Sequence, residues 1–268
     1  MRGTALSIAG SDPSGGAGIQ ADLKTFAAFG VYGAAVPTAL TAQNLQGVRA
    51  SFDVPVPFLV QQLDAVLDDL ALGAIKTGML PTGDAVRAVA HALDRVRAVP
   101  LVVDPVLVST SGHALADGGA LAAIRAELLP RATLVTPNLS EATALTGTEV
   151  RSRDDMQRAA RALVALGARA ALVKGGHADG SAYDVLLADG VVTELDARRI
   201  AVVSTHGTGC TLSAGIAAAL ARGERLPDAV ARAKRYVWRA LARAAGQPYA
   251  LDHGVDPDAE NEDDRPRG

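Results

Sequence analysis

The feature that most limits the fold is a regular alternation of short apolar runs with longer segments of helical periodicity. Each apolar run is continuous, as in strands that are covered on both faces. A strand–helix–strand rhythm generates parallel strands, so the sequence predicts an α/β fold, a three-layer αβα sandwich with a mostly parallel sheet. The predicted strands are Ala5–Ala9, Ala34–Ala39, Ala74–Lys76, Leu101–Asp104, Thr133–Thr136 and Ala170–Lys174. The predicted helices are Gly18–Phe29, Pro57–Leu72, Gly83–Arg97, Gly118–Leu128, Ser140–Thr146, Arg153–Leu166, Cys210–Ala221 and Pro227–Ala245.

This rhythm changes near residue 183. Three apolar runs follow one another without an intervening helical pattern: Tyr183–Ala188, Val191–Ala197 and Ile200–Val203. Asp189-Gly190, between the first two runs, is a strong signal for a two-residue hairpin turn. We therefore expect an antiparallel extension at one edge of the sheet.

Composition predicts how the chain is divided. Of its 268 residues, 49% are apolar and 21% are charged, so the chain can bury one substantial core. No change in composition marks a boundary before the C-terminal end, which predicts a single domain over residues 1–250. Residues 251–268 are acidic and poor in apolar side chains, and we expect them to form a disordered, solubilising tail.

Charge and cysteine content limit the partners and the compartment. A net charge of −3 and an aromatic content of 3% argue against nucleic acid as a partner. No apolar stretch is long enough to span a bilayer and no signal-peptide pattern is present, so no membrane association is expected. The single cysteine, Cys210, permits no internal disulfide and favours the cytoplasm. An exposed sheet edge favours a homodimer.

The strongest local signal is the turn Gly207-Thr208-Gly209-Cys210, directly before an alanine-rich apolar run. A glycine turn at a helix start exposes backbone N–H groups at the positive end of the helix, which predicts an anion site, above all for phosphate. Such groups also stabilise the charge of a phosphoryl group in transfer. A thiol at this position is expected to have a lowered pKa and to accept a hydroxyl proton. The alternative is a glycine-rich turn with an incidental thiol.

Glycine-rich or polar clusters follow most of the predicted strands. In open parallel sheets, ligands bind beyond the carboxyl ends of the strands. So many clusters at one rim are hard to explain as connecting loops alone, and they predict a single site. The clusters are Gly10–Gly18, Thr77–Met79, Asp104–Val106, Pro137–Glu141, Gly175–His177 and Thr205–Cys210.

Four residues in the N-terminal part of the chain are candidates for binding a small substrate. The loop that begins at Gly10 matches no nucleotide fingerprint, and we interpret it as backbone folded around a small molecule, with a flexible turn as the alternative. In that loop, Asp12 could bind a hydroxyl or amino group. The amide of Gln43 offers a donor and an acceptor to an aminopyrimidine edge. Met79 could pack on a flat ring. The alternatives are an ordinary surface or loop glutamine for Gln43 and ordinary core packing for Met79.

Two acids suggest a magnesium site. Asp104 ends the fourth predicted strand and Glu141 follows the fifth. Mg²⁺ uses one or two carboxylates together with waters and phosphate oxygens, so these acids suit a direct or indirect shell. A capping box, with Asn138 as N-cap and Glu141 three residues later, explains the second acid equally well.

Two basic residues are candidates for contacting a nucleotide. Lys174 ends a buried strand beside two glycines, from where it can reach a phosphate. Lys234 is within a predicted helix, and a solvent-exposed helix face is its default interpretation. His177 and His206 have no metal-ligand spacing with Cys210, and we interpret them as loop residues.

In this order, the clusters resemble the ribokinase-like superfamily. Within it, the chain is most similar to the bifunctional hydroxymethylpyrimidine/phosphomethylpyrimidine kinases of thiamine biosynthesis. The resemblance extends from about residue 4 to residue 247 and leaves out only the acidic tail. It is carried by Ile8–Thr25, Thr38–Asn44, Lys76–Leu80, Val103–Val106, Thr136–Ala142, Val173–His177 and Thr205–Thr211.

This resemblance implies a kinase that uses MgATP to phosphorylate 4-amino-5-hydroxymethyl-2-methylpyrimidine and then its monophosphate. It implies that Cys210 is the base and that Gly207, Thr208 and Gly209 form the anion hole. Gln43, Met79 and Val106 match pyrimidine-pocket positions, to which the loop analysis adds Gly10 and Asp12. Lys174, Thr205 and Lys234 match nucleotide-contacting positions, and Asn138 is assigned with them to binding the nucleotide. Asp104 and Glu141 match magnesium-linked acids.

Two alternatives remain open at this point. A pyridoxal kinase of the same branch would bind a flat ring that also carries a hydroxymethyl group, and its aldehyde could form a hemithioacetal with Cys210. A non-catalytic pyrimidine or nucleotide sensor would use the same scaffold without chemistry. The intact set of Lys174, Glu141 and Gly207–Cys210 argues against a sensor.

Overall fold

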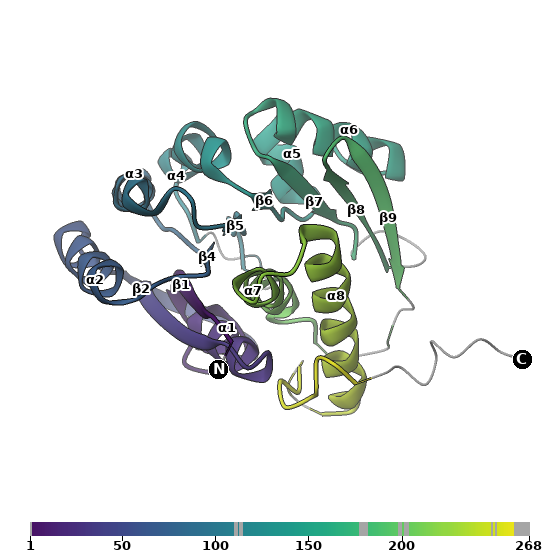
Figure 1. The fold of residues 1–268 in the computed structure, drawn as a ribbon, viewed down its shortest axis with the longest axis horizontal. Coiled ribbons are helices and arrows are strands. Elements are labelled where there is room, and N and C mark those ends of the chain that lie inside the picture. The colour runs from purple at the N-terminus through teal and green to yellow at the C-terminus, as the bar shows by residue number, and fades with distance from the viewer. Residues whose placement is uncertain are drawn as a thin grey trace, which may run out of the picture.

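The computed structural model describes residues 2–109, 112, 115–176, 182–197, 200, 204–247, 249 and 251–259. In these residues, one sheet of nine strands runs in the order β3-β2-β1-β4-β5-β6-β7-β8-β9 (Figure 1). Its strands are β1 Thr4–Ser11, β2 Tyr32–Asn44, β3 Gly47–Asp53, β4 Ala74–Thr77, β5 Leu101–Val103, β6 Leu134–Val135, β7 Ala170–Lys174, β8 Ala182–Ala188 and β9 Val191–Ala197.

The sheet confirms the predicted fold class. Strands β2, β1, β4, β5, β6 and β7 pair in parallel, and β8 and β9 add an antiparallel edge after β7. The strands β7 and β9 have the predicted bounds. Of the third predicted run, Ile200–Val203, only Ile200 is described and it lies in no regular element, whereas residues 201–203 are outside the described part.

A second antiparallel pair was missed by the sequence analysis. The predicted second strand ends at Ala39, whereas β2 continues to Asn44 and pairs with β3. Five of the seven residues of β3 are exposed, so this strand shows no buried apolar run. The extension of β2 places Gln43 within the strand, whereas the predicted strand ended before it.

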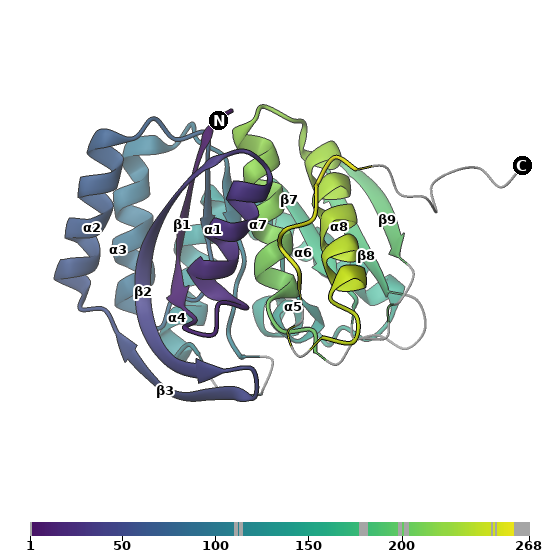
Figure 2. The same ribbon diagram turned by 90° about the horizontal axis from the view of Figure 1, so that it is seen from below.

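Helices cover both faces of the sheet (Figures 1 and 2). On one face α1, α7 and α8 form a core with Phe26, Phe29 and Tyr236, and the other helices pack on the opposite face. Among the described helices, none is long and apolar enough to cross a membrane. The helices are α1 Gly18–Ala28, α2 Val56–Asp69, α3 Gly83–Leu93, α4 Gly118–Ala123, α5 Leu139–Thr146, α6 Arg153–Ala165, α7 Thr208–Ala221 and α8 Leu226–Arg243.

Two predicted helices change into other helical turns before their predicted ends. The α3 helix gives way to a 3₁₀ turn at Asp94–Val96. The α4 helix gives way to a π-helical turn at Ile124–Leu128 and then to a 3₁₀ turn at Leu129–Arg131. Pro130 lies in that last turn, and its ring and missing N–H oppose continuation of the α-helix.

The central helix, α7, positions the predicted anion turn. Residues 211–219 of this helix are all buried, and most are alanine or another small residue. Small side chains allow close approach: a Cβ at Gly215 would lie 3.0 Å from the Cβ of Ala233 on α8. The first turn of α7 is therefore fixed by packing on several sides.

The acidic tail differs from its prediction. Leu251 and Val255 are each 7% exposed and belong to the core cluster of α1, α7 and α8. The segment 251–259 lies along α8, on the side facing α1 (Figure 2). The prediction of disorder is wrong for this segment, because two apolar side chains four residues apart suffice to dock it. Residues 260–268 are outside the described part.

Candidate active site

The turn before α7 has the backbone conformation of an anion site. Gly207 is the N-cap of α7 with φ +82°, and a Cβ at this position would lie 1.8 Å from the carbonyl oxygen of Gly16. Only glycine fits such an approach. The Thr208 N–H donates to the carbonyl oxygen of Thr205 at 3.2 Å. Helix geometry leaves the N–H groups of Gly209 and Cys210 without an intrahelical acceptor, so they are available to an anion.

The first loop packs directly on this turn. Besides the approach of Gly16 to Gly207, the backbone N–H of Gly18 is near enough to Cys210 to lower the pKa of its thiol. The two clusters that the sequence separates most widely are therefore in contact. Because α1 begins at Gly18, two helix N-termini meet at this point.

Asp12 holds the first loop together. Its carboxylate accepts hydrogen bonds from Ser14 N at 2.9 Å, Ser14 Oγ at 2.7 Å and Ala17 N at 2.8 Å, and it pairs with His206 Nε2 at 2.8 Å. Burial raises the pKa of Asp12, but the bonds from His206 and Ser14 outweigh it and lower this pKa to about 2. Asp12 is therefore an ionised brace between two loops, and its predicted substrate contact stays a prediction.

His206 joins this brace to the predicted pyrimidine-binding residue. Its Nε2 is 3.2 Å from Nε2 of Gln43, whose amide also lies 3.1 Å from Oγ1 of Thr41. Thr41 Oγ1 in turn donates to the carbonyl oxygen of Ser11 at 2.9 Å. The sequence analysis treated His206 as an ordinary loop residue, since nothing in its spacing links it to residues almost two hundred positions away.

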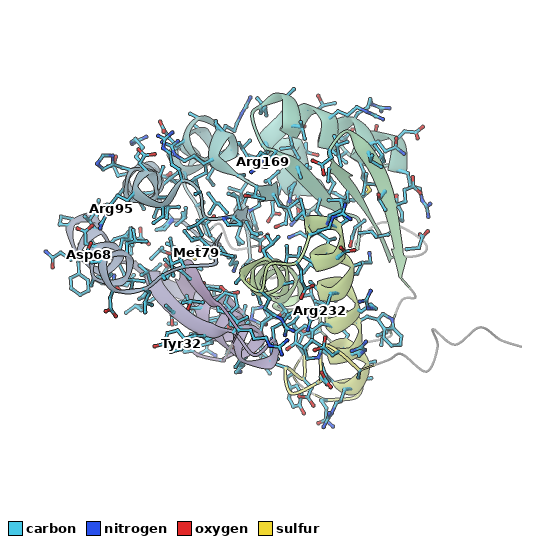
Figure 3. All side chains as sticks on the ribbon, viewed as in Figure 1. Tyr32, Asp68, Met79, Arg95, Arg169 and Arg232 are labelled. Atoms are coloured by element: carbon cyan, nitrogen blue, oxygen red, sulfur yellow. The ribbon has the colours of Figure 1, made fainter. Side chains whose placement is uncertain are left out.

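The structure brings Gly10 and Met79 together and places Val106 beyond β5. A Cβ at Gly10 would lie 2.8 Å from the sulfur of Met79, so these residues are in contact. Met79 is 8% exposed and lies in the interior just beyond β4 (Figure 3). Val106 is half-buried beyond β5, and its N–H donates to the carbonyl oxygen of Asp104 at 2.9 Å.

A buried ion pair lies beside the turn. Nζ of Lys174 is 2.9 Å from Oδ1 of Asp104, which also accepts from Thr136, while Ser213 of α7 donates to Oδ2 at 3.0 Å. Burial raises the pKa of Asp104, but Lys174 and Lys76 outweigh it and leave this pKa lowered.

The ammonium group of this pair faces the anion turn. Burial lowers the pKa of Lys174, but Asp104 and then Glu141 outweigh it and raise this pKa. A Cβ at Gly209 would lie 3.2 Å from Nζ of Lys174. A permanent cation therefore lies next to the free amides.

Glu141 has the capping role that the sequence allowed, and its magnesium role stays a prediction. It forms a complete capping box: Asn138 N donates to Oε2 at 2.8 Å, and Glu141 N donates to Oδ1 of Asn138 at 2.9 Å. Burial raises the pKa of Glu141 to about 7, opposed first by Lys174; Asp104 raises it further, and the amides of Asn138 and Leu107 lower it. Glu141 is thus also part of the charge cluster of Lys174 and Asp104.

The two acids fit a magnesium ion only in part. Within the described ranges, no group of three or more His, Cys, Asp or Glu side chains is placed to hold a metal. Mg²⁺ bound to a nucleotide needs only one or two carboxylates, because phosphate and water supply the other ligands. Asp104 already accepts from Lys174, Thr136 and Ser213, so its chemistry fits a link to Mg²⁺ through water better than direct ligation.

The remaining nucleotide candidates have different surroundings. A β-bridge pairs Asn138 with Lys174. Thr205 is exposed at the start of the turn. Lys234 is not on a solvated face: its Nζ bonds Oδ2 of Asp184 at 2.6 Å and the carbonyl oxygen of Leu195 at 2.5 Å. The contacts of these residues with a nucleotide stay predictions.

The thiol of Cys210 does not have the lowered pKa that was expected. Burial raises its pKa to about 11, and the negative charges of Asp22 and Asp104 act in the same direction. The positive charge of Lys76 and the Gly18 N–H oppose this without outweighing it. The prediction of partial ionisation is wrong because it considered the helix terminus and not the depth at which the sulfur lies.

Beneath the thiol is an ion pair that the sequence analysis missed. Nζ of Lys76 is 2.9 Å and 2.7 Å from the two carboxylate oxygens of Asp22, and Ser7 Oγ donates to one of them at 2.5 Å. Both charged side chains are 0% exposed. Asp22 lies on α1 and is fully buried. Its position one helical turn after Gly18, on the buried face of α1, was the available signal.

Free amides at a helix start, a lysine beside them and two nearby carboxylates are the parts of a phosphoryl-transfer enzyme. The family model described as phosphomethylpyrimidine kinase matches residues 12–257. The chain belongs to this family. The comparison confirms the family that the sequence motifs indicated.

Curated relatives agree with this assignment. The hydroxymethylpyrimidine/phosphomethylpyrimidine kinase of Rhizobium meliloti is 51% identical over 91% of this chain and 92% of its own length. The kinase of the same name from Streptomyces coelicolor is 47% identical over 93% of each chain. The thiamine biosynthesis bifunctional protein ThiED of Geobacter sulfurreducens is 46% identical. The match covers 94% of this chain but only 51%, about half, of that relative.

Solved structures show the same fold. The phosphomethylpyrimidine kinase of Clostridium difficile 630 superposes with a TM-score of 0.79 at 40% identity, covering 88% of this chain and 98% of that one. The pyridoxal kinase of Staphylococcus aureus in complex with AMP-PCP superposes with a TM-score of 0.86 at 34% identity, covering 95% of this chain and 94% of that one. These matches confirm the ribokinase-like fold, and the family confirms an ATP-using kinase of thiamine biosynthesis rather than a sensor.

Proposed function

We propose that this kinase phosphorylates the hydroxymethyl group of 4-amino-5-hydroxymethyl-2-methylpyrimidine and then the resulting monophosphate, at one site and with Mg²⁺. The observation that carries the proposal is the anion turn, with the free amides of Gly209 and Cys210 between the first loop and Lys174. The curated relatives that are named for both reactions support it, at up to 51% identity. The pyridoxal kinases among the solved structures are less similar in sequence, at 33 to 37% identity.

The chain's own groups supply most of the catalysis in this proposal. The amides of Gly209 and Cys210 and the ammonium group of Lys174 face the negative charge of the transferring phosphoryl group. Magnesium, linked through water to Asp104 and Glu141, would neutralise charge on the phosphates. The loop that begins at Gly10 and the neighbouring Met79 hold the pyrimidine, so that its hydroxyl is positioned for the transfer.

Cys210 acts on the substrate hydroxyl as a thiolate in this proposal. A pKa of about 11 keeps the thiol protonated in most molecules at neutral pH. If the thiolate takes the hydroxyl proton, kcat/KM of the free enzyme should rise about tenfold per pH unit over the range where the thiolate is rare. Cys210→Ala should lower turnover by about two to four orders of magnitude and remove this pH dependence. Wild-type turnover in Cys210→Ala would remove the thiol from the mechanism.

A product assay tests the function directly. ATP, Mg²⁺ and the hydroxymethylpyrimidine should yield the monophosphate and then the diphosphate, separable by anion-exchange chromatography. The same assay with pyridoxal measures the alternative substrate. We expect kcat/KM to be higher for the aminopyrimidine, because the Gln43 amide matches the donor and acceptor of its edge. A higher value for pyridoxal, or a monophosphate that is never converted, would contradict the corresponding part of the proposal.

The assembly and location follow from surface features. We propose a single domain that forms a cytoplasmic homodimer without nucleic acid. The β2–β3 pair forms one edge of the sheet and carries the exposed side chains of Tyr32, Leu40 and Phe52, which are 49%, 49% and 64% exposed. Sedimentation of the protein at micromolar concentration should give the mass of two chains. Phe52→Lys should shift that mass to one chain if this edge is the interface.

A further inference from the structure

The C-terminal segment 251–259 reaches the helix that carries the anion turn. It lies between α8 and α1 in both views of the fold (Figures 1 and 2). His253 of this segment lies with Nε2 3.0 Å from Oγ1 of Thr211. Thr211 is 0% exposed and directly follows Cys210. A residue from the predicted tail therefore contacts the first turn of α7.

Thr211 is itself connected to the anion turn. Its N–H donates to the carbonyl oxygen of Gly207 at 2.9 Å, which closes the first hydrogen-bonded turn of α7. The free amides of Gly209 and Cys210 lie within that turn. Any shift of Thr211 thus moves the carbonyl contact that sets the direction of these amides.

Several contacts fix the position of His253. Its carbonyl oxygen accepts from Oη of Tyr236 on α8 at 2.9 Å. Just before it, the N–H of Asp252 donates to the carbonyl oxygen of Ala240 at 3.1 Å, and the carboxylate of Asp252 is 3.0 Å from Nε of Arg243. Leu251 and Val255 anchor the segment in the core on either side.

The segment is also held beyond Val255. The guanidinium of Arg239 donates to the carbonyl oxygen of Asp256 at 2.7 Å. Arg232 of α8 (Figure 3) forms an ion pair with Asp258, and its guanidinium also lies over the ring of Phe29. These contacts hold the segment along the whole described length of the tail, so the imidazole of His253 is not free to swing away from Thr211.

The imidazole is neutral at this position. Burial lowers the pKa of His253 to about 4, and the positive charge of Lys24 acts in the same direction, against the negative charge of Asp252. A neutral imidazole has one donor and one acceptor nitrogen, and either can pair with a hydroxyl group, which both donates and accepts. The contact with Thr211 is thus maintained throughout the neutral pH range.

We propose that His253 is a positioning residue for phosphoryl transfer. Through Thr211 it holds the first turn of α7, so that the amides of Gly209 and Cys210 keep their direction toward the transferring phosphoryl group. This inference rests on the proposed function of the turn. It assigns to the C-terminal segment a part in the reaction, although no atom of that segment needs to touch the substrate.

The test uses variants of both partners in the full-length enzyme. His253→Leu keeps bulk and removes the ring nitrogens, His253→Gln restores a hydrogen-bonding group, and Thr211→Val removes only the hydroxyl. His91→Leu is the matched control, because His91 on α3 is exposed and lies on the opposite face of the sheet. Circular dichroism and the melting temperature establish that each variant folds.

The informative readout compares two ligands. ADP alone does not fill the site of the transferring phosphoryl group, whereas ADP with aluminium fluoride and Mg²⁺ mimics that group. His253→Leu and Thr211→Val should each lower kcat and the affinity for the mimic about three- to tenfold, the loss expected for one buried hydrogen bond, with ADP affinity unchanged. His253→Gln should recover most of the loss, and the double variant should be no worse than either single variant.

Other results would overturn the inference. Equal losses for ADP and for the mimic would mean a general structural role, and additive losses in the double variant would mean that His253 does not act through Thr211. Unchanged kcat in both single variants would also refute it. Thr211→Val keeps the test decisive if His253→Leu does not fold. If the wild-type enzyme itself binds no mimic and forms no product, it is the proposed function that fails.

Discussion

The buried pair of Lys76 and Asp22 allows the sharpest test of how the site is built. Lys76→Met removes the cation but keeps most of the bulk of the side chain. It leaves the carboxylate of Asp22, which is 0% exposed, with only the hydroxyl of Ser7 as a side-chain donor among the bonds described. Removing one partner of a buried ion pair costs about 3–5 kcal/mol, because the other charge stays buried and uncompensated. For a protein of this size, that corresponds to a fall of about 6–20 °C in melting temperature.

The pH dependence of the loss identifies its cause. Burial raises the pKa of Asp22, and Lys76 opposes that rise. In Lys76→Met the opposition is gone, so the folded state holds the Asp22 proton to a higher pH than the unfolded state does. When the pKa of Asp22 is higher in the folded than in the unfolded protein, its protonation stabilises the fold fully below the unfolded-state pKa of about 4. This contribution is lost as the pH rises through the pKa that Asp22 has in the folded protein. The variant should therefore be closest to wild type at pH 5 and lose stability toward pH 8.

Urea unfolding followed by circular dichroism at pH 5, 6, 7 and 8 measures this loss. Lys76→Met/Asp22→Asn should recover most of the stability, because asparagine is neutral and still accepts from Ser7. Arg87→Met is the control, since its pair with Asp84 is exposed and worth at most about 1 kcal/mol. A loss below about 1 kcal/mol in Lys76→Met, or a loss that does not change with pH, would refute the reasoning.

Three further predictions concern the turn and its neighbours. Gly207→Ala should destabilise the protein by well over the roughly 1–2 kcal/mol that a left-handed alanine costs, since its Cβ would lie 1.8 Å from the carbonyl oxygen of Gly16. The control is Gly246→Ala, at the same φ but in open space, which should cost only about 1–2 kcal/mol. Urea unfolding measures both losses. Alkylation of Cys210 by iodoacetamide should be slow at pH 8 and accelerate toward pH 10, since burial raises the pKa of the thiol to about 11. Mass spectrometry detects the alkylated protein, and an alkylation rate that levels off below about pH 9 would contradict the prediction. Lys174→Gln should raise the KM for ATP about tenfold or more while the KM for the pyrimidine stays near wild type, because the proposed charged hydrogen bond to phosphate is lost. Steady-state kinetics measures both values, and a rise of both together would contradict this prediction.

Strands buried on both faces could be predicted from the sequence, and the exposed edge could not. The strands β4 to β7 are covered by helices, so burial imposes a continuous apolar run that remains visible in the sequence. The strand β3 has no such constraint, because most of its side chains face solvent and its pairing with β2 depends on backbone hydrogen bonds. The same limit affected the tail, where docking depends on only two apolar residues, Leu251 and Val255.

The site could be located from the sequence more easily than its interactions. Glycines and polar residues after successive strands indicated the rim, because parallel strands bring their carboxyl ends together. The partners within the rim depend on tertiary distances: Asp12 with His206, and Asp22 with Lys76. The predicted direction of the pKa shift of Cys210 was wrong for the same reason. Burial and the helix terminus act on this pKa in opposite directions, and only the structure shows which of them is larger.

The first turn of α7 is held from three sides before any ligand binds. The first loop fixes it through the contacts of Gly16 with Gly207 and of Gly18 with Cys210. The end of β7 places Lys174 beside Gly209, and the C-terminal segment reaches it at Thr211. A turn that is already ordered requires little rearrangement when charge develops on a phosphoryl group, and such preorganisation is where the largest electrostatic gain in catalysis arises. The three supports come from parts of the chain that are distant in sequence, so the geometry of the proposed anion site depends on the completed fold and not on the glycine motif alone.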